Sequence, residues 1–141
     1  MDLKPDVISI LVGTNDAGRE SRSVPELSYH GMEPAMDLLF TQTREILPHT
    51  KLIVLEPFLL NSGNFDADLF HRRFALLQDY QKMIREKAKE YGALFVPLQE
   101  RFFEAEKRRP ANYWLWDSVH PTYAGHGLIA EAFLQDTKGY F

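Results

Sequence analysis

Asp117 and His120 stand three residues apart in the segment Asp117-Ser118-Val119-His120-Pro121, just before the last predicted helix. A carboxylate at this spacing can hold an imidazole ring in one tautomer and stabilise the ring when it is protonated. His120 would then serve as a general base in acyl transfer. Pro121 favours an extended backbone at His120, which directs the ring away from the helix. The residues alone also allow a simple helix cap with an incidental histidine.

A second polar segment, Gly13-Thr14-Asn15-Asp16, directly follows an apolar run. A glycine at this point permits a tight turn or a close approach of the backbone. An asparagine on such a loop can aim an amide N–H at a developing oxyanion, which contributes about 3 kcal/mol where it has been tested. The alternative is a plain Asn-Asp loop that caps the next segment.

The elements that would position these residues alternate between strands and helices. Three short apolar runs, 7–12, 52–55 and 93–96, are typical of parallel strands that are covered on both faces. Helical patterns lie between and after them, and we place these at 34–47, from about 66 to 91, at 99–107 and at 122–135. This order predicts one domain over residues 1–141 with a three-layer α/β/α fold and a parallel sheet. Ligands bind at the carboxyl ends of the strands in such folds, where both polar segments lie.

Particular residues predict where two of the helices begin and end. Pro34 is suited to a helix start and Pro48 to a helix end. Asp66 or Asp68 can cap the long helix at its N-terminus, and Gly92 stands where a helix ends in a left-handed turn.

Composition excludes several classes of protein. The chain has 141 residues, a formal net charge of -4 and no cysteine, so disulfides, thiolate metal sites and a cysteine nucleophile are excluded. The sequence has no block of like charges long enough to indicate a nucleic-acid partner. It also has no apolar run that approaches the roughly 20 residues needed to span a bilayer. The absence of cysteine fits a reducing compartment, so we expect a cytoplasmic location. From the charge pattern and the short apolar runs, we expect neither nucleic-acid nor membrane partners.

Together the two polar segments resemble those of the SGNH hydrolases, also called GDSL esterases. The segment beginning at Gly13 looks like the family's third block, Gly-x-Asn-Asp, and the segment beginning at Asp117 looks like its fifth. The resemblance implies a flavodoxin-like α/β/α fold. It also implies that Asn15 is the side-chain donor of an oxyanion hole, that Gly13 shapes its loop, and that Asp117 and His120 are the acid and base of a serine triad.

Two connecting stretches resemble one branch of that family. Glu56-Pro57-Phe58 and Trp114-Leu115-Trp116 are most similar to the carbohydrate-deacetylating branch, near the acetylxylan esterases. Trp114 and Trp116 are therefore candidates for a wall on which a sugar ring stacks, although both could equally be core residues. No cofactor is expected. A metal site built from Asp16, Asp117 and His120 is the less favoured alternative to a metal-free mechanism.

The nucleophile of the family is absent from this sequence. The family's first block, Gly-Asp-Ser, and its second, which supplies a glycine N–H, do not occur here. The family places both before Asp6, so we expect that roughly the first third of a complete domain, with its first strands, lies outside this chain. The family's first strand would lie beside residues 7–12. We therefore expect an exposed strand edge through which the chain pairs with another strand or forms a homo-oligomer.

No serine of the chain is a good replacement for that nucleophile. Ser9 lies inside a predicted strand, and Ser118 lies between the proposed triad partners. Ser21 and Ser23 lack the context of a nucleophile elbow.

The sequence therefore predicts a serine ester hydrolase that works through an acyl-enzyme. The expected substrate is a small acyl ester, with acetylated carbohydrate first and a short-chain lipid or aryl ester second. Two alternatives stay open at this point. The chain could be a non-catalytic fragment that retains a saccharide-binding cleft, or one part of a split enzyme whose nucleophile lies on a separate chain.

Overall fold

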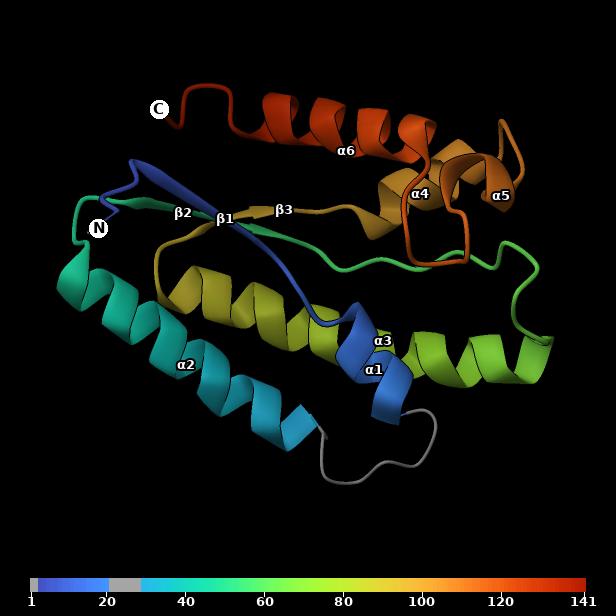
Figure 1. Ribbon diagram of the computed structural model, residues 1–141, viewed down its shortest axis with the longest axis horizontal. Helices are drawn as coiled ribbons and strands as arrows, with labels where there is room; N and C mark the ends of the chain where they lie inside the picture. The colour runs from blue at the N-terminus through green and yellow to red at the C-terminus, as the bar shows by residue number, and fades with distance from the viewer. Residues whose placement is uncertain (1–2, 21–28) are drawn as a thin grey trace.

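The computed structural model describes residues 3–20 and 29–141. Strands β1 (Val7–Leu11), β2 (Lys51–Leu55) and β3 (Leu94–Val96) form a parallel sheet in the order β1-β2-β3. Helices α2 (Tyr29–Ile46) and α3 (Ala67–Glu90) cover one face, and α4 (Gln99–Glu106) and α6 (Tyr123–Asp136) cover the other (Figure 1). The predicted α/β fold with a parallel sheet between two layers of helices is confirmed.

The side chains of the central strand β2 belong to two hydrophobic cores, one on each face of the sheet. Leu52 and Val54 belong to the core cluster under α2 and α3, and Ile53 and Leu55 belong to the cluster under α4 and α6. Side chains alternate between the two faces of a strand, so a strand covered on both faces is apolar at every position. The apolar run at 52–55 predicts β2 correctly for this reason.

Strand β1 differs from the expectation that residues 7–12 would be covered on both faces. Ser9 and Leu11 are exposed, and 43% of Leu11 is accessible to solvent. Among the described residues β1 pairs only with β2, from Val7 opposite Lys51 to Leu11 opposite Leu55. Its other edge has no strand beside it in that part of the chain, which leaves an apolar strand with unpaired backbone groups.

We expect this edge to pair with another strand, because apolar unpaired edges are sites of association. The chain should self-associate at micromolar concentration in analytical ultracentrifugation. Leu11→Lys places a charge on the edge and should shift the population towards monomer. Leu38→Lys is the matched control, because Leu38 is 59% exposed on α2 and belongs to no strand. A wild-type chain that remains monomeric would contradict this expectation.

The long helix α3 follows its predicted pattern closely. The side chain of Asp66 accepts a hydrogen bond from the N–H of Leu69 at 2.7 Å, so Asp66 is the cap of the two aspartates that were considered. Tyr80 and Ile84 on its apolar stripe are fully buried. The helix ends at Glu90, and Gly92 follows in the left-handed region with a φ of 62°.

Three details of the helices were not predicted. Helix α2 begins at Tyr29, so Pro34 lies inside it and does not start it. Met32 packs against the core before the proline, and Met36 and Phe40 are buried in the core after it, so packing holds the helix on both sides of the proline. Two short helices were also missed: α1 (Thr14–Glu20) and α5 (Ala111–Trp114). Both are too short to show a helical period in the sequence.

Candidate active site

The structure joins Asp117 and His120 directly. Nδ1 of His120 lies 2.7 Å from Oδ2 and 2.9 Å from Oδ1 of Asp117. Both side chains reach solvent, with 69% of the His120 side chain and 45% of the Asp117 side chain exposed. An ionised carboxylate only accepts hydrogen bonds, so Nδ1 carries the proton and Nε2 has a free lone pair. The pair therefore presents a hydrogen-bond acceptor to whatever binds beside it.

The backbone around the pair closes a compact loop between α5 and α6. Oδ1 of Asp117 also accepts the N–H of His120 at 2.9 Å and that of Val119 at 3.3 Å. The N–H of Trp116 donates to the carbonyl of His120 at 2.8 Å, which brings the two ends of the loop together. The loop is thus held both by the Asp117 carboxylate and by its own backbone.

The pKa of Asp117 lies below its ordinary value of 3.8. Partial burial of the carboxylate acts in the opposite direction and raises the pKa. The hydrogen bonds from the His120 backbone, the His120 ring and the Val119 backbone outweigh that effect, because they favour the charged form. Asp117 therefore stays ionised over the pH range in which an imidazole acts as a base.

This shift predicts a pH dependence of stability. A carboxyl with a depressed pKa in the folded state stabilises the fold above its unfolded pKa, here about 3.8, and this stabilisation is lost as the pH falls through the folded pKa. Titration of the Asp117 carboxyl by ¹³C NMR should give a midpoint below 3.8. The midpoint should rise in His120→Ala, because that variant loses the ring hydrogen bond. A midpoint unchanged by His120→Ala would contradict the assignment.

Ser118 has a buried side chain and an unusual backbone. Its φ is 75°, and none of its surface is exposed. Its Oγ lies 3.0 Å from Oγ of Ser62 and accepts the N–H of Ser62 at 3.1 Å. The hydroxyl therefore points into the protein, and a substrate in solvent does not reach it.

Residues 56–62 follow the carboxyl end of β2 and contact the loop at Ser118. Buried side chains hold this segment in place. Oε1 of Gln99 accepts the N–H of Leu59 and its Nε2 donates to the carbonyl of Leu59, both at 2.9 Å. Nε2 of Gln81 donates to the carbonyl of Pro57 at 2.7 Å. These bonds satisfy the backbone of a buried segment that belongs to no strand.

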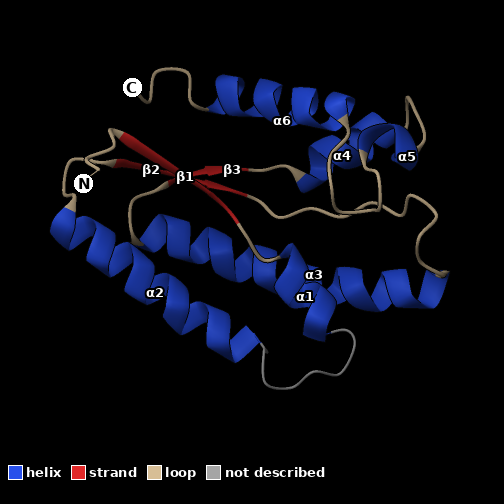
Figure 2. Cartoon of the chain, viewed as in Figure 1, coloured by secondary structure: helices blue, strands red, loops and turns tan. Residues whose placement is uncertain are grey.

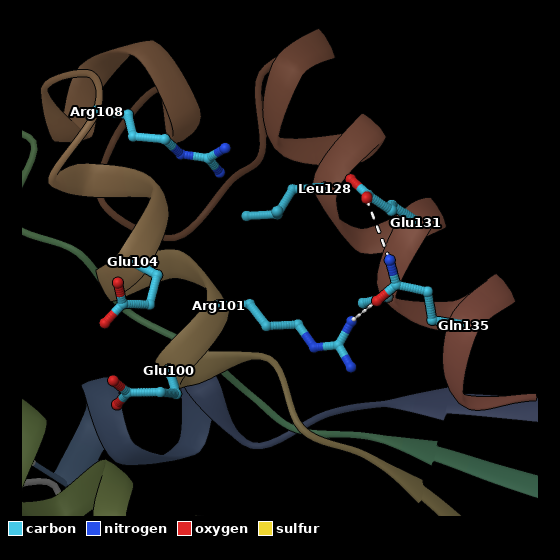
Figure 3. Close-up of a pocket in the computed structure, with 8 residues that line it drawn as sticks. Glu100, Arg101, Glu104, Arg108, Leu128, Glu131 and Gln135 are labelled. Carbon is cyan, nitrogen blue, oxygen red and sulfur yellow. Dashed lines mark hydrogen bonds between the residues drawn. The ribbon is translucent and has the colours of Figure 1, made fainter.

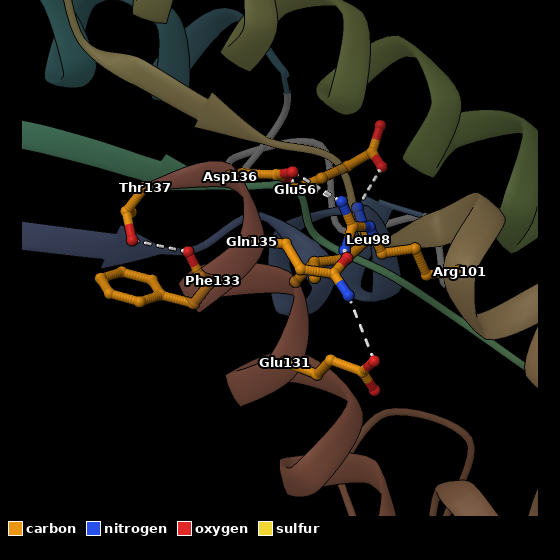
Figure 4. A network of polar contacts seen from close by, with 8 residues as sticks. All are labelled: Glu56, Leu98, Arg101, Glu131, Phe133, Gln135, Asp136 and Thr137. Atoms are coloured by element: carbon orange, nitrogen blue, oxygen red, sulfur yellow. Dashed lines mark hydrogen bonds and ion pairs between the residues drawn. The ribbon is translucent and has the colours of Figure 1, made fainter. Parts of the chain in front are cut away.

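Glu56, at the start of the same segment, caps α4. Its Oε2 accepts the N–H group of Leu98 at 2.8 Å (Figure 4). The same oxygen accepts the N–H of Gln99 at 2.9 Å, and Oε1 lies 3.1 Å from a guanidinium nitrogen of Arg85. The sequence analysis did not predict this role. The available signal was a carboxylate directly after a buried strand, which has to find partners inside the protein.

Gly13 and Asn15 lie at the carboxyl end of β1. Gly13 has a φ of 111° and faces the core, where a Cβ would stand 3.0 Å from Cδ1 of Ile84. Asn15 lies in the first turn of α1 and not in an open loop, and it is exposed. Its side chain has no hydrogen bond to any residue that the structure describes. A hollow of about 190 Å³ lies here, lined by residues 11–16.

Both polar segments lie beyond the carboxyl ends of the strands, at the end of the sheet toward which the arrows point (Figure 2). They also share a core, because Ala17 of α1 belongs to the cluster under α3 and Val119 packs against that cluster. The carbonyl of Ser118 accepts the N–H of Leu60, which ties the second segment to the end of β2. The fold thus places the candidate residues at the edge where parallel α/β proteins bind ligands.

The two tryptophans have different environments. Trp114 is half-buried against the second core, and its indole N–H donates to the carbonyls of Ala105 and Arg109, each at 3.1 Å. Trp116 is 65% exposed and directly precedes Asp117. The structure therefore favours a core role for Trp114 and leaves Trp116 free for contact with a ligand.

The other candidates of the sequence analysis do not join this group. Ser9 lies on β1, and Ser21 and Ser23 lie outside the described residues. Across the described ranges 3–20 and 29–141, no three acidic or histidine side chains are grouped as a metal site would need. In the same ranges no helix is long and apolar enough to cross a membrane.

A separate hollow of about 310 Å³ lies between α4 and α6 (Figure 3). It shares no lining residue with the two polar segments. Arg101 on its wall pairs with Asp136 at 2.7 Å, and Gln135 donates to Glu131 at 3.2 Å, so two of its charged side chains have partners within the protein. Its lining comprises Glu100, Arg101, Glu104, Arg108, Leu128, Glu131, Ala132 and Gln135.

Known proteins resemble this chain in sequence and in structure. Residues 1–128 match the profile of the GDSL-like Lipase/Acylhydrolase family. An acetylxylan esterase of Geobacillus stearothermophilus is 30% identical over 138 residues, which are 94% of this chain and 59% of that protein. A crystal structure of that organism's acetylxylan esterase superposes with a TM-score of 0.76 at 29% identity, over 94% of this chain and 59% of the other.

A protein from Parabacteroides merdae, described as a GDSL-like lipase, superposes with a TM-score of 0.83 at 32% identity. The match covers 96% of this chain and 61% of that one. This chain thus spans about three fifths of the length of these relatives.

Proposed function

The chain belongs to the GDSL-like lipase/acylhydrolase family, and from this we propose that it supplies the general base and the oxyanion donor of a serine ester hydrolase. The observation that carries the proposal is the Asp117–His120 pair, with a ring nitrogen 2.7 Å from a carboxylate oxygen. With Nδ1 directed at Asp117, the neutral form of the exposed His120 ring has its lone pair on Nε2, as a base for a serine hydroxyl requires.

The proposed reaction has two stages. Nε2 of His120 takes the proton of a serine hydroxyl while the serine oxygen attacks the ester carbonyl, and Asp117 stabilises the imidazolium through Nδ1. The Asn15 amide donates to the oxyanion, and the imidazolium then protonates the departing alcohol oxygen. Water repeats the sequence on the acyl-enzyme, releases the acid and restores the serine. The scheme needs no metal or cofactor.

The serine in this scheme comes from outside these 141 residues, because they contain no Gly-Asp-Ser block. Known variants of the Geobacillus esterase support a scheme in which the serine and the aspartate come from different parts of one protein. Two of its solved structures are of variants called catalytic, one with a serine replaced at position fifteen and one with an aspartate replaced far along the chain. In that esterase a tryptophan directly precedes the aspartate, as Trp116 precedes Asp117 here.

The proposal is tested with a fluorophosphonate probe and p-nitrophenyl acetate. We expect no serine of the 141-residue chain to be labelled and no turnover above background. Addition of a segment that carries Gly-Asp-Ser and the strand beside β1 should produce labelling on the added serine, together with turnover. Labelling of a serine within the chain would overturn the division of roles. Saccharide binding that persists without any turnover in the assembled protein would favour a non-catalytic role.

We propose an acetylated carbohydrate as the substrate, and Trp116 as the surface on which a sugar ring rests. The flat face of an exposed indole suits the apolar face of a pyranose, and contacts of aromatic rings contribute about 0.5–1.5 kcal/mol. In the protein assembled with the serine-bearing segment, Trp116→Ala should raise the KM for acetylated xylo-oligosaccharide by roughly 3- to 10-fold. Hydrolysis of p-nitrophenyl acetate, which has no sugar, should change little.

The matched control is Phe141→Ala, because Phe141 is 64% exposed and lies beside Lys51, at the amino end of β2. It should leave both reactions unchanged. Equal losses on the two substrates in Trp116→Ala would point to a displaced Asp117 and not to a sugar contact.

A further inference from the structure

We infer that the paired hydroxyls of Ser62 and Ser118 position Asp117 and His120, so that both serines are positioning residues. This inference rests on the proposed function for its catalytic meaning. Its physical content is that two neutral side chains, 56 residues apart in the sequence, hold the turn on which the Asp117–His120 hydrogen bond depends.

The turn at Ser118 needs support because its backbone is left-handed. Ser118, with a φ of 75°, is the only residue other than glycine that has a positive φ in the described part of the chain. Side chains with a Cβ rarely adopt this conformation. It reverses the chain directly after Asp117, so that one carboxylate oxygen can accept the N–H groups of both Val119 and His120.

The hydrogen bonds of the two serines run in one consistent direction. The N–H of Ser62 donates to Oγ of Ser118 at 3.1 Å, and Oγ of Ser62 donates to Oδ1 of Asn64 at 3.2 Å. With its own proton given to Asn64, Ser62 can only accept in the 3.0 Å contact, so the Ser118 hydroxyl donates to it. The buried Ser118 hydroxyl therefore uses both its proton and a lone pair in hydrogen bonds to Ser62.

The backbone adds a third link, since the N–H of Leu60 donates to the carbonyl of Ser118 at 3.2 Å. Residues 56–62 are themselves held by Gln81 and Gln99, both of which are buried. The turn is therefore hydrogen-bonded to a segment whose own backbone is held by buried side chains. Through the Ser62–Ser118 contact, residues 56–62 support the turn that carries Asp117 and His120, the residues proposed to do the chemistry.

The position of the His120 ring can be measured without any turnover. ¹⁵N NMR of the imidazole distinguishes the Nδ1–H tautomer from the Nε2–H tautomer and from a mixture of the two. We expect the wild-type chain to show the Nδ1–H form at pH 8. Ser62→Ala should move the two ring-nitrogen signals towards each other, because a loosened turn lets the ring leave Asp117. Ser118→Gly, which tolerates the left-handed backbone but lacks the hydroxyl, should show the same shift.

Two further variants separate positioning from general stability. Ser62→Thr retains the hydroxyl and should keep the wild-type spectrum. Ser9→Ala makes the same change at an exposed serine of β1 and should also leave the spectrum unchanged. The thermal midpoint of each variant is measured in parallel.

Wild-type spectra in both Ser62→Ala and Ser118→Gly would overturn the inference, even if their thermal midpoints fell. The outcome is independent of the test of function. A spectral shift in Ser62→Ala, in a protein that hydrolyses no ester even with the serine-bearing segment added, would support the positioning contact and refute the proposed reaction. Turnover that requires His120, together with an unchanged Ser62→Ala spectrum, would do the reverse.

Discussion

Replacement of His120 by alanine is expected to lower ester hydrolysis by about 10⁴- to 10⁶-fold in the protein assembled with a serine-bearing segment. The ring is the only proposed acceptor of the serine proton and the only proposed donor to the leaving oxygen. Its loss should leave just the background rate that substrate binding and the oxyanion donor can sustain. Initial rates with p-nitrophenyl acetate measure this directly.

A second variant tests the role of the carboxylate. Asp117→Asn should cost about 10⁴-fold, because an amide can stabilise the wrong tautomer of the ring. The two losses should not add in the double variant, since both residues act through one proton transfer. His49→Ala is the control, because His49 is exposed on the turn between α2 and β2 and should have no effect. Full activity in His120→Ala would refute the proposed base.

Gly125→Ala is expected to destabilise the fold by about 3 kcal/mol, at the upper end of the cost of overpacking. A Cβ at Gly125 would stand 2.2 Å from the carbonyl oxygen of Trp114, and 3.1 Å from Cβ of Pro121. The first turn of α6 sits directly on that carbonyl, which also accepts the N–H of Thr122 at 2.9 Å. An added methyl group would therefore push α6 away from α5.

Urea unfolding measures the effect, and the same helix provides the control. Gly127 has open space where a Cβ would lie, so Gly127→Ala should stabilise the protein by roughly 0.5–1 kcal/mol. The two glycines are two residues apart in one helix. If the two substitutions changed the free energy of unfolding in opposite directions, the contact at Gly125 and not helix propensity would be the cause. Equal behaviour of the two variants would contradict the packing.

The contact at Gly125 also bears on the site. Residues 115–121 run from the end of α5 to the start of α6, so a shift of α6 moves the loop that carries Asp117 and His120. We therefore expect the imidazole spectrum of His120 to change in Gly125→Ala and to stay constant in Gly127→Ala.

The features that could be predicted from the sequence depend on neighbours along the chain. Asp117 and His120 are three residues apart, so their hydrogen bond is possible within one short loop. The Asp66 cap lies three residues from the N–H that it accepts. Strand β2 was readable because it is covered on both faces, which makes each of its residues apolar.

Other features needed contacts between distant segments. Ser62 and Ser118 are 56 residues apart, and Glu56 caps a helix that begins more than 40 residues later. No local pattern distinguishes such a glutamate or serine from an exposed one. The two tryptophans differ for the same reason: Trp114 faces α4 and Trp116 faces solvent, although only one residue separates them.

By itself, the sequence determined the order of the strands and of the longer helices, the Asp117–His120 pair and the polar segment that starts at Gly13, because each of these is encoded by residues a few positions apart. Only the tertiary structure decided that Ser9 and Leu11 of β1 face solvent, that Asn15 lies in the first turn of a short helix, and that Ser118 is buried against Ser62. Burial and pairing at these positions are set by segments that are remote in the chain, and chain folding alone brings such segments together.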